Sequence, residues 1–146
     1  MDKTNKRMNI INNLENYPVL KAEIRRLELE KQRIEGEYIG VHGIGYGNIK
    51  QGSPTNKVTS SVELEFAYKE AAKRELEAKI NDKSIEAEII DNALSVLTEE
   101  ELKLIELRYF KKRKVNYIAN VLEINPDTVS RRIKIIINRI EPLIVV

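Results

Sequence analysis

Apolar residues follow a coiled-coil spacing in two long stretches of the chain. The first stretch has alternating steps of four and three residues, at Leu20, Ile24, Leu27, Lys31 and Ile34, and Lys31 is the one position that is not apolar. A longer stretch keeps this spacing at Val62, Phe66, Lys69, Lys73, Leu76, Ile80, Lys83, Ala87, Ile90, Leu94 and Leu97. Such stripes are typical of helices that pack side by side. They predict an all-α fold with a long coiled-coil-like hairpin, in which residues 18–36 pack on part of residues 62–95. Pairing of the same stripes between two subunits satisfies the pattern equally well.

Pro18 marks the expected start of the first long helix. Proline suits the first turn of a helix, and Asn16 just before it is a favoured cap. A separate, shorter helix is therefore expected over about residues 4–15.

A glycine-rich segment separates the two stripes. All six glycines of the protein lie within residues 36–52, and we expect a non-helical loop over residues 36–60, either a mobile tether or a short glycine-rich hairpin. The run from Gly43 to Gly47 lacks the Gly-Lys-Ser/Thr ending of a P-loop and the following helix of a dinucleotide site. His42, in the same segment, is interpreted as a solvated loop residue.

The last third of the chain predicts three shorter helices. Thr98 and Glu101 form a capping box, and Leu97 and Leu102 can form a hydrophobic staple around it. A short helix follows over about residues 115–122. Asn125 is then a cap, with Pro126 at the first helical position and Asp127 near the positive helix end.

The final helix is amphipathic. Steps of 100° place its apolar positions on one side: Val129, Ile133, Ile136, Ile137 and Ile140. The opposite side carries Asp127, Arg131, Lys134 and Asn138, whose donors and acceptors match base edges in the major groove. Phosphate contacts are assigned to Ser130, Arg132, Arg139 and the basic run Lys111, Lys112, Arg113 and Lys114. Thr128 completes the candidate DNA-binding set. A basic surface helix in a plain bundle is the alternative interpretation.

The amino-acid composition excludes several kinds of functional site. The chain has no cysteine and one histidine, so a disulfide framework, a thiolate zinc site and a multi-histidine metal cluster are excluded, and we expect no catalysis, metal or cofactor. The net charge of +2 hides a strong asymmetry. Residues 61–101 carry five Lys/Arg against twelve Asp/Glu, whereas residues 102–146 carry ten against four. A basic module of this kind favours nucleic-acid binding. No apolar run approaches the ~20 residues of a membrane span, so no membrane association is expected, and the cytoplasm is the expected compartment.

Residues 97–143 contain four short motifs, Leu97-Thr98-Glu99-Glu100, Leu107-Arg108-Tyr109-Phe110, Ile118-Ala119 and Thr128-Val129. Through these motifs the segment resembles the helix-turn-helix of sigma-factor region-four-like domains. The turn position that such domains usually fill with glycine holds Glu123, and Lys114 stands where they often have a Ser or Thr cap. The layout of the whole chain is similar to phage late-gene regulators of the RinA/ArpU type.

The resemblance implies a sequence-specific, DNA-binding regulator of phage or prophage late genes, acting as an activator in the bacterial host cytoplasm. Its implied partners are double-stranded DNA, host RNA polymerase and a second copy of the chain in a homodimer. Residues 1–95 are expected to form the helical oligomerisation region and residues 96–146 the DNA-binding domain. A small terminase subunit that binds DNA for packaging is the alternative, and a coiled-coil adaptor that binds no DNA is a third.

Overall fold

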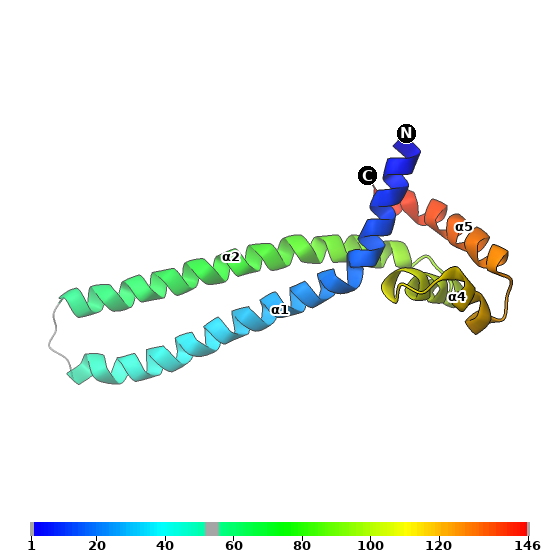
Figure 1. Ribbon diagram of the computed structural model, residues 1–146. Helices are drawn as coiled ribbons and strands as arrows, with labels where there is room; N and C mark the ends of the chain where they lie inside the picture. Colours follow the sequence, from blue (N-terminus) through cyan, green and yellow to red (C-terminus); the bar gives the residue numbers. More distant parts are fainter. Residues whose placement is uncertain (1, 52–55, 146) are drawn as a thin grey trace. The chain divides into compact units, whose positions relative to one another are not determined.

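Most of the chain that the structure describes is helical. The computed structural model describes residues 2–51 and 56–145, with side chains described for residues 3–36 and 61–145. Within these ranges there is no strand, which confirms the predicted all-α class. In chain order the elements are α1 (Asp2–Gln51), α2 (Asn56–Leu94), α3 (Glu99–Ile105), the π-helical segment η1 (Glu106–Phe110), α4 (Val115–Leu122) and α5 (Pro126–Ile144) (Figure 1).

Residues 23–84 form one compact unit, which we call the hairpin unit. Here α1 and α2 run side by side in opposite directions, as Figure 1 shows, so the predicted long hairpin is confirmed. Cross-helix ion pairs link Lys83 Nζ to Glu23 Oε2 at 2.7 Å and Lys31 Nζ to Glu77 Oε1 at 3.2 Å. The stripe lysines Lys31, Lys73 and Lys83 are only partly exposed, and their ammonium groups pair with carboxylates on the other helix.

The second compact unit joins Met1–Ala22 to Ile85–Val146, and we call it the core unit. Its centre is a continuous apolar cluster whose most deeply buried members include Ile10, Leu14, Leu104, Ile105, Ile118, Val129, Ile136, Ile137 and Ile140. The beginning of α1 supplies Ile10 and Leu14, which lie far from the rest of the cluster in sequence. The compact units therefore divide the chain differently from the expected boundary between residues 95 and 96.

The expected helix start at Pro18 is wrong. The α-helix runs through this position, so Pro18 lies inside α1 and Asn16 does not cap a new helix. A proline within a helix removes one backbone hydrogen bond. Burial of Ile10, Leu14 and Tyr17 in the core unit provides the packing that keeps the helix continuous on the N-terminal side of the proline.

The glycine-rich segment differs from the predicted non-helical loop because most of its backbone is helical. Helix α1 extends to Gln51 and α2 begins at Asn56, so most of residues 36–60 is assigned as helix. Glycine lowers helix propensity by about 1 kcal/mol per residue relative to alanine, which disfavours a helix without forbidding it. The side chains of residues 37–60, including His42 and the run from Gly43 to Gly47, lie outside the described residues.

None of the helices in the described ranges combines the length and the apolar character required to cross a membrane.

Candidate nucleic-acid interface

Helix α3 begins with the predicted capping box. The Thr98 hydroxyl accepts a hydrogen bond from the Glu101 backbone N–H at 3.3 Å, and the Glu101 carboxylate accepts one from the Thr98 backbone N–H at 3.1 Å. Leu97 and Leu102 both pack against the core cluster, as expected of a staple. These contacts fix the start of the helix that supports α5.

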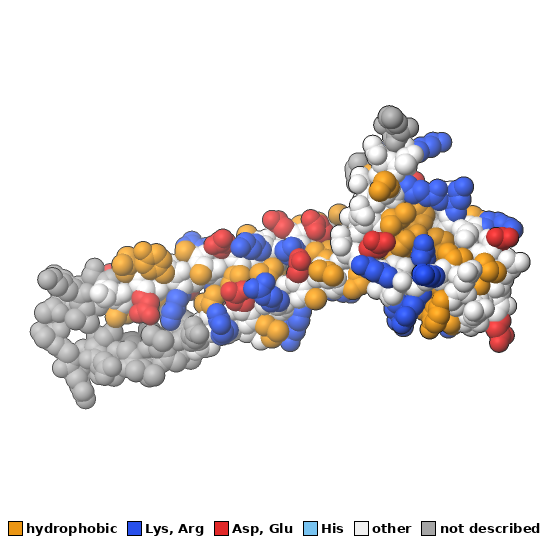
Figure 2. All heavy atoms as spheres, viewed as in Figure 1, with side chains coloured by type: hydrophobic (Ala, Val, Ile, Leu, Met, Phe, Trp, Pro, Cys, Tyr) orange, Lys and Arg blue, Asp and Glu red, His pale blue; other side chains and the backbone are white. Residues whose placement is uncertain are grey.

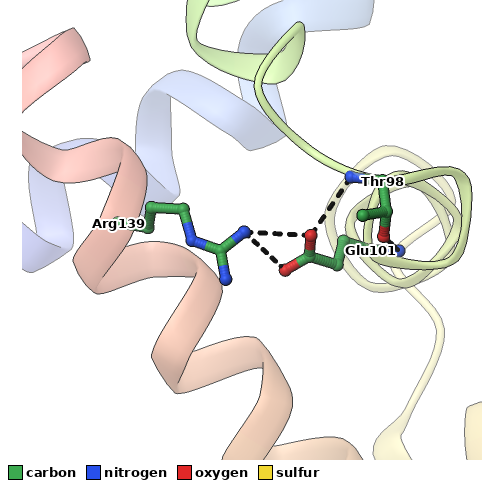
Figure 3. Close-up of polar contacts among 3 residues, drawn as sticks. All are labelled: Thr98, Glu101 and Arg139. Atoms are coloured by element: carbon green, nitrogen blue, oxygen red, sulfur yellow. Dashed lines mark hydrogen bonds and ion pairs between the residues drawn. The ribbon is translucent and has the colours of Figure 1, made fainter.

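Glu101 also holds α5 in place. Its carboxylate pairs with the Arg139 guanidinium at 2.8 Å, so one side chain joins the α3 cap to the middle of α5 (Figure 3). The hydrogen bond from the Thr98 backbone, together with the nearby Arg139 charge, lowers the pKa of Glu101 below its usual range. The phosphate-contact role of Arg139 stays a prediction, and in the structure one of its guanidinium nitrogens, Nη1, is engaged by the Glu101 carboxylate.

A tight turn connects α4 to α5. Glu123 adopts the left-handed conformation with φ 57° and ψ 43°, and its backbone N–H donates to the Ala119 carbonyl. The Ile124 N–H donates to the same carbonyl at 3.0 Å. Glutamate in place of glycine at such a position costs about 1 kcal/mol. The turn is made nonetheless, and it brings α4 against α5, with Ala119 and Val129 both buried.

Helix α5 starts and orients as the sequence indicates. The Asn125 side chain accepts a hydrogen bond from the Asp127 N–H at 3.0 Å, and Pro126 occupies the first helical turn. Its apolar side is buried, comprising Val129, Ile133, Ile136, Ile137, Ile140 and Ile144. Side chains expected to contact DNA are exposed on the rest of the helix surface, at Asp127, Ser130, Arg131, Arg132, Lys134 and Asn138. Thr128 differs from them because it is half-buried.

The basic run is an ordered connection between η1 and α4. Lys111, Lys112, Arg113 and Lys114 are all exposed. Arg108 Nη1 donates to the Arg113 carbonyl at 3.0 Å, and the Arg113 N–H donates to the Leu107 carbonyl at 2.9 Å. The Arg113 guanidinium also lies 5.1 Å from the centre of the Tyr117 ring. Lys114 begins α4 without a side-chain cap.

Lys and Arg are spread over both units, with fourteen in the core unit and eleven in the hairpin unit. In Figure 2, Lys and Arg side chains gather over the core unit on the face in view, whereas blue and red side chains alternate along the hairpin unit. The exposed side chains that are candidates for DNA contact lie in two parts of the core unit, the connection before α4 and the outer side of α5. Together they offer phosphate contacts and groups that can form hydrogen bonds with base edges.

A second polar cluster in the core unit has a structural role. The Tyr17 hydroxyl donates to Asp91, and Lys21 Nζ lies 3.8 Å from the same carboxylate. Burial, followed by the contact with Asp91, raises the pKa of Tyr17. The Tyr17 ring lies 5.3 Å from the Phe110 ring, which ties α1 to the end of η1. The hydroxyl is therefore engaged in joining helices.

Sequence reasoning missed three features of this surface. It did not find the π-helical segment, the anchoring of the basic run by Arg108, or Ile135, whose side chain is 51% exposed on α5. The exposure of Ile135 was readable from the sequence, because its helical angle lies away from the apolar stripe.

Among the side chains that the structure describes, no cluster of three or more His, Asp or Glu residues is placed to hold a metal ion. Comparison of the chain with protein-family models, curated proteins and solved structures finds no match.

Proposed function

We propose that this protein is a sequence-specific DNA-binding transcription regulator with no catalytic role. Its core unit binds double-stranded DNA, with α5 in the major groove. Arg131, Lys134, Asn138 and Asp127 face the base edges, while Ser130, Arg132 and the basic run contact phosphates.

One observation carries the proposal. Helices α4 and α5 meet through a short turn, residues 123–125, in which the backbone N–H groups of Glu123 and Ile124 donate to the Ala119 carbonyl. Helix α5 buries its apolar side and exposes a mainly polar and basic side. A helix presented in this way is the shape that helix-turn-helix proteins place in a major groove. Exposed Lys and Arg on the preceding connection supply the sequence-independent part of the affinity.

The biological setting follows from the resemblance to phage late-gene regulators. We propose activation of late genes in the cytoplasm of a bacterial host, through a homodimer that contacts host RNA polymerase. In this arrangement the hairpin unit supplies the dimer or polymerase contact, and the core unit supplies the DNA contact.

Selection of bound duplexes tests the proposal. The full chain is incubated with fragmented DNA from the encoding genome and with random duplexes, and the enriched sequences are then measured individually. We expect a defined site bound at least about 10³-fold more tightly than random DNA at physiological salt. Equal affinity for all duplexes, or no binding at low salt, would contradict sequence-specific regulation.

The salt dependence of binding tests the basic run separately. Lys111→Ala is expected to weaken binding to specific and random DNA alike and to lower the slope of log affinity against log salt by about one. Lys79→Ala, in the hairpin unit, is the matched control because it removes an exposed lysine outside the proposed interface. An unchanged slope in Lys111→Ala would remove the basic run from the interface.

A small terminase subunit is the competing function. The hairpin unit exposes apolar side chains such as Leu29, at 47%, which are available for packing against other subunits. Mass measurement of the protein in solution separates the two functions. A dimer supports regulation, whereas a ring of many subunits supports packaging.

A further inference from the structure

Ile135 is the exception among the isoleucines of α5. The other five are at most 9% exposed, whereas Ile135 is 51% exposed. A lone exposed apolar residue needs no explanation by itself, but the neighbours of Ile135 are informative. Arg131 lies four residues before it and Asn138 three residues after it, so the three side chains are adjacent on the helix surface. An apolar group thus sits between two of the proposed base-contacting residues.

The major groove offers one apolar feature that such a group can recognise. Thymine carries a 5-methyl group there, and apolar side chains contact it, whereas arginine forms paired hydrogen bonds with guanine O6 and N7. Four residues of helix, a rise of about 6 Å, separate Arg131 from Ile135, and this distance corresponds to roughly one or two base-pair steps.

Building on the proposed function, we propose that Ile135 is a specificity-determining residue that packs on a thymine methyl group. The preferred site then carries a thymine within one or two base pairs of the base that Arg131 contacts. Val and Leu at this position would retain the contact, and Ala would lose it.

Ile135 also borders a small hollow between α3 and α5. Its other lining residues are Glu100, Glu101, Leu104, Arg132 and Ile136, and its volume is about 200 Å³. Ligand pockets usually measure about 300–1,000 Å³, so this hollow is small for an organic ligand. Its Glu101 is already paired with Arg139. A group that touches only the exposed tip of Ile135, as a thymine methyl would, fits these surroundings better than a buried ligand.

Deoxyuridine substitution tests the contact directly, because it removes the methyl group and changes nothing else in the base pair. In the best duplex from the selection experiment, each thymine is replaced singly by deoxyuridine, and dissociation constants are measured for the unaltered protein. The same duplexes are measured with Ile135→Ala, with the conservative Ile135→Val, and with Leu143→Ala, which truncates another exposed apolar side chain of α5.

We expect one thymine per half-site whose replacement weakens binding by the unaltered protein about fourfold, the factor for one buried methyl group. Ile135→Val and Leu143→Ala should retain this sensitivity, and Ile135→Ala should lose it. Insensitivity of the unaltered protein at every thymine overturns the proposal, as does an undiminished methyl effect in Ile135→Ala. Failure to select any preferred duplex contradicts the DNA-binding function itself, so the two failures are distinguishable.

Discussion

The hairpin unit and the core unit are both helical, but they are stabilised in different ways. Among the described side chains of the hairpin unit, Leu76 is the one buried hydrophobic residue, and charged side chains link the two helices. The described side chains of the core unit include nineteen buried hydrophobic residues, nine of them isoleucines. Exposed ion pairs contribute little to stability, whereas each buried aliphatic side chain contributes about 1.5–3 kcal/mol. The stable part of the molecule is therefore the part that carries the candidate DNA surface.

This difference in stability suits the two units to different binding functions. A contact surface for DNA must hold several side chains in fixed relative positions, and a well-packed core provides that rigidity. A hairpin with few fully buried side chains opens at lower free energy and can adapt to a partner. The comparison thus supports the proposed arrangement, with DNA bound by the core unit and a protein contacted by the hairpin unit.

The largest expected effect comes from truncating the centre of the core. Ile140 is fully buried, and Ile140→Ala should lower the free energy of unfolding of the core unit by about 2–5 kcal/mol. Leu76→Ala should instead reduce hydrogen-exchange protection in the hairpin unit and leave the core unit unchanged. Urea denaturation followed by hydrogen exchange with mass spectrometry would show this. If either variant lowered the stability of both units equally, the proposed difference in stability between the units would be wrong.

Acid sensitivity should be traceable to Glu101. Since the folded-state pKa of Glu101 lies below its ordinary value of 4.5, its stabilising effect is present above that pH and is lost as the pH falls through the lowered folded pKa. Glu101→Gln keeps a capping side chain but removes the charge that pairs with Arg139. We expect it to cost about 1 kcal/mol at pH 7 and less below pH 4.

Urea titrations between pH 7 and pH 3 check this prediction. The stability of the Gln variant should fall less steeply with acid than that of the unaltered protein. Parallel pH curves for the two proteins would show that the Glu101 charge does not contribute.

Relief of backbone strain should stabilise the turn between α4 and α5. Glu123 and Lys112 are the described non-glycine residues with positive φ, at 57° and 53°. Glu123→Gly should raise the free energy of unfolding by up to about 1 kcal/mol, because glycine adopts this conformation without a Cβ clash. Thermal denaturation measures the gain. Glu123→Ala is the control, and an equal gain in that variant would mean that charge, not strain, is responsible.

The smallest effect is expected within the hairpin unit. Lys31 and Glu77 approach to 3.2 Å but remain partly exposed. A double-mutant cycle with Lys31→Ala and Glu77→Ala should give a coupling free energy of about 0.2–1 kcal/mol that decreases in 1 M NaCl. Hydrogen exchange of the hairpin amides supplies the local stability. A coupling above this range, or one insensitive to salt, would show that the hairpin is held more strongly than we describe.

Local signals in the sequence predicted much of the core unit. The capping box at Thr98, the Asn125 cap and the buried isoleucines of α5 depend on residues close together in the chain, and all three are confirmed. The sequence pattern also predicted the paired stripes of the hairpin.

Long-range packing explains what local signals did not predict. The continuous helix through Pro18 depends on Tyr17 and its neighbours docking with residues more than seventy positions away, such as Asp91. The pairing of Arg139 with Glu101 spans 38 residues, so spacing on α5 alone could not predict it.

The central claim is that the core unit recognises DNA sequence through α5, and one measurement tests it most directly. Dissociation constants are determined on the selected duplex and on a scrambled duplex for the unaltered protein, for Arg131→Ala, and for Lys79→Ala as the charge-matched control in the hairpin unit. We predict that Arg131→Ala reduces discrimination between the two duplexes by about 1–3 kcal/mol, whereas Lys79→Ala leaves discrimination unchanged. Equal weakening of both duplexes by Arg131→Ala would contradict the claim.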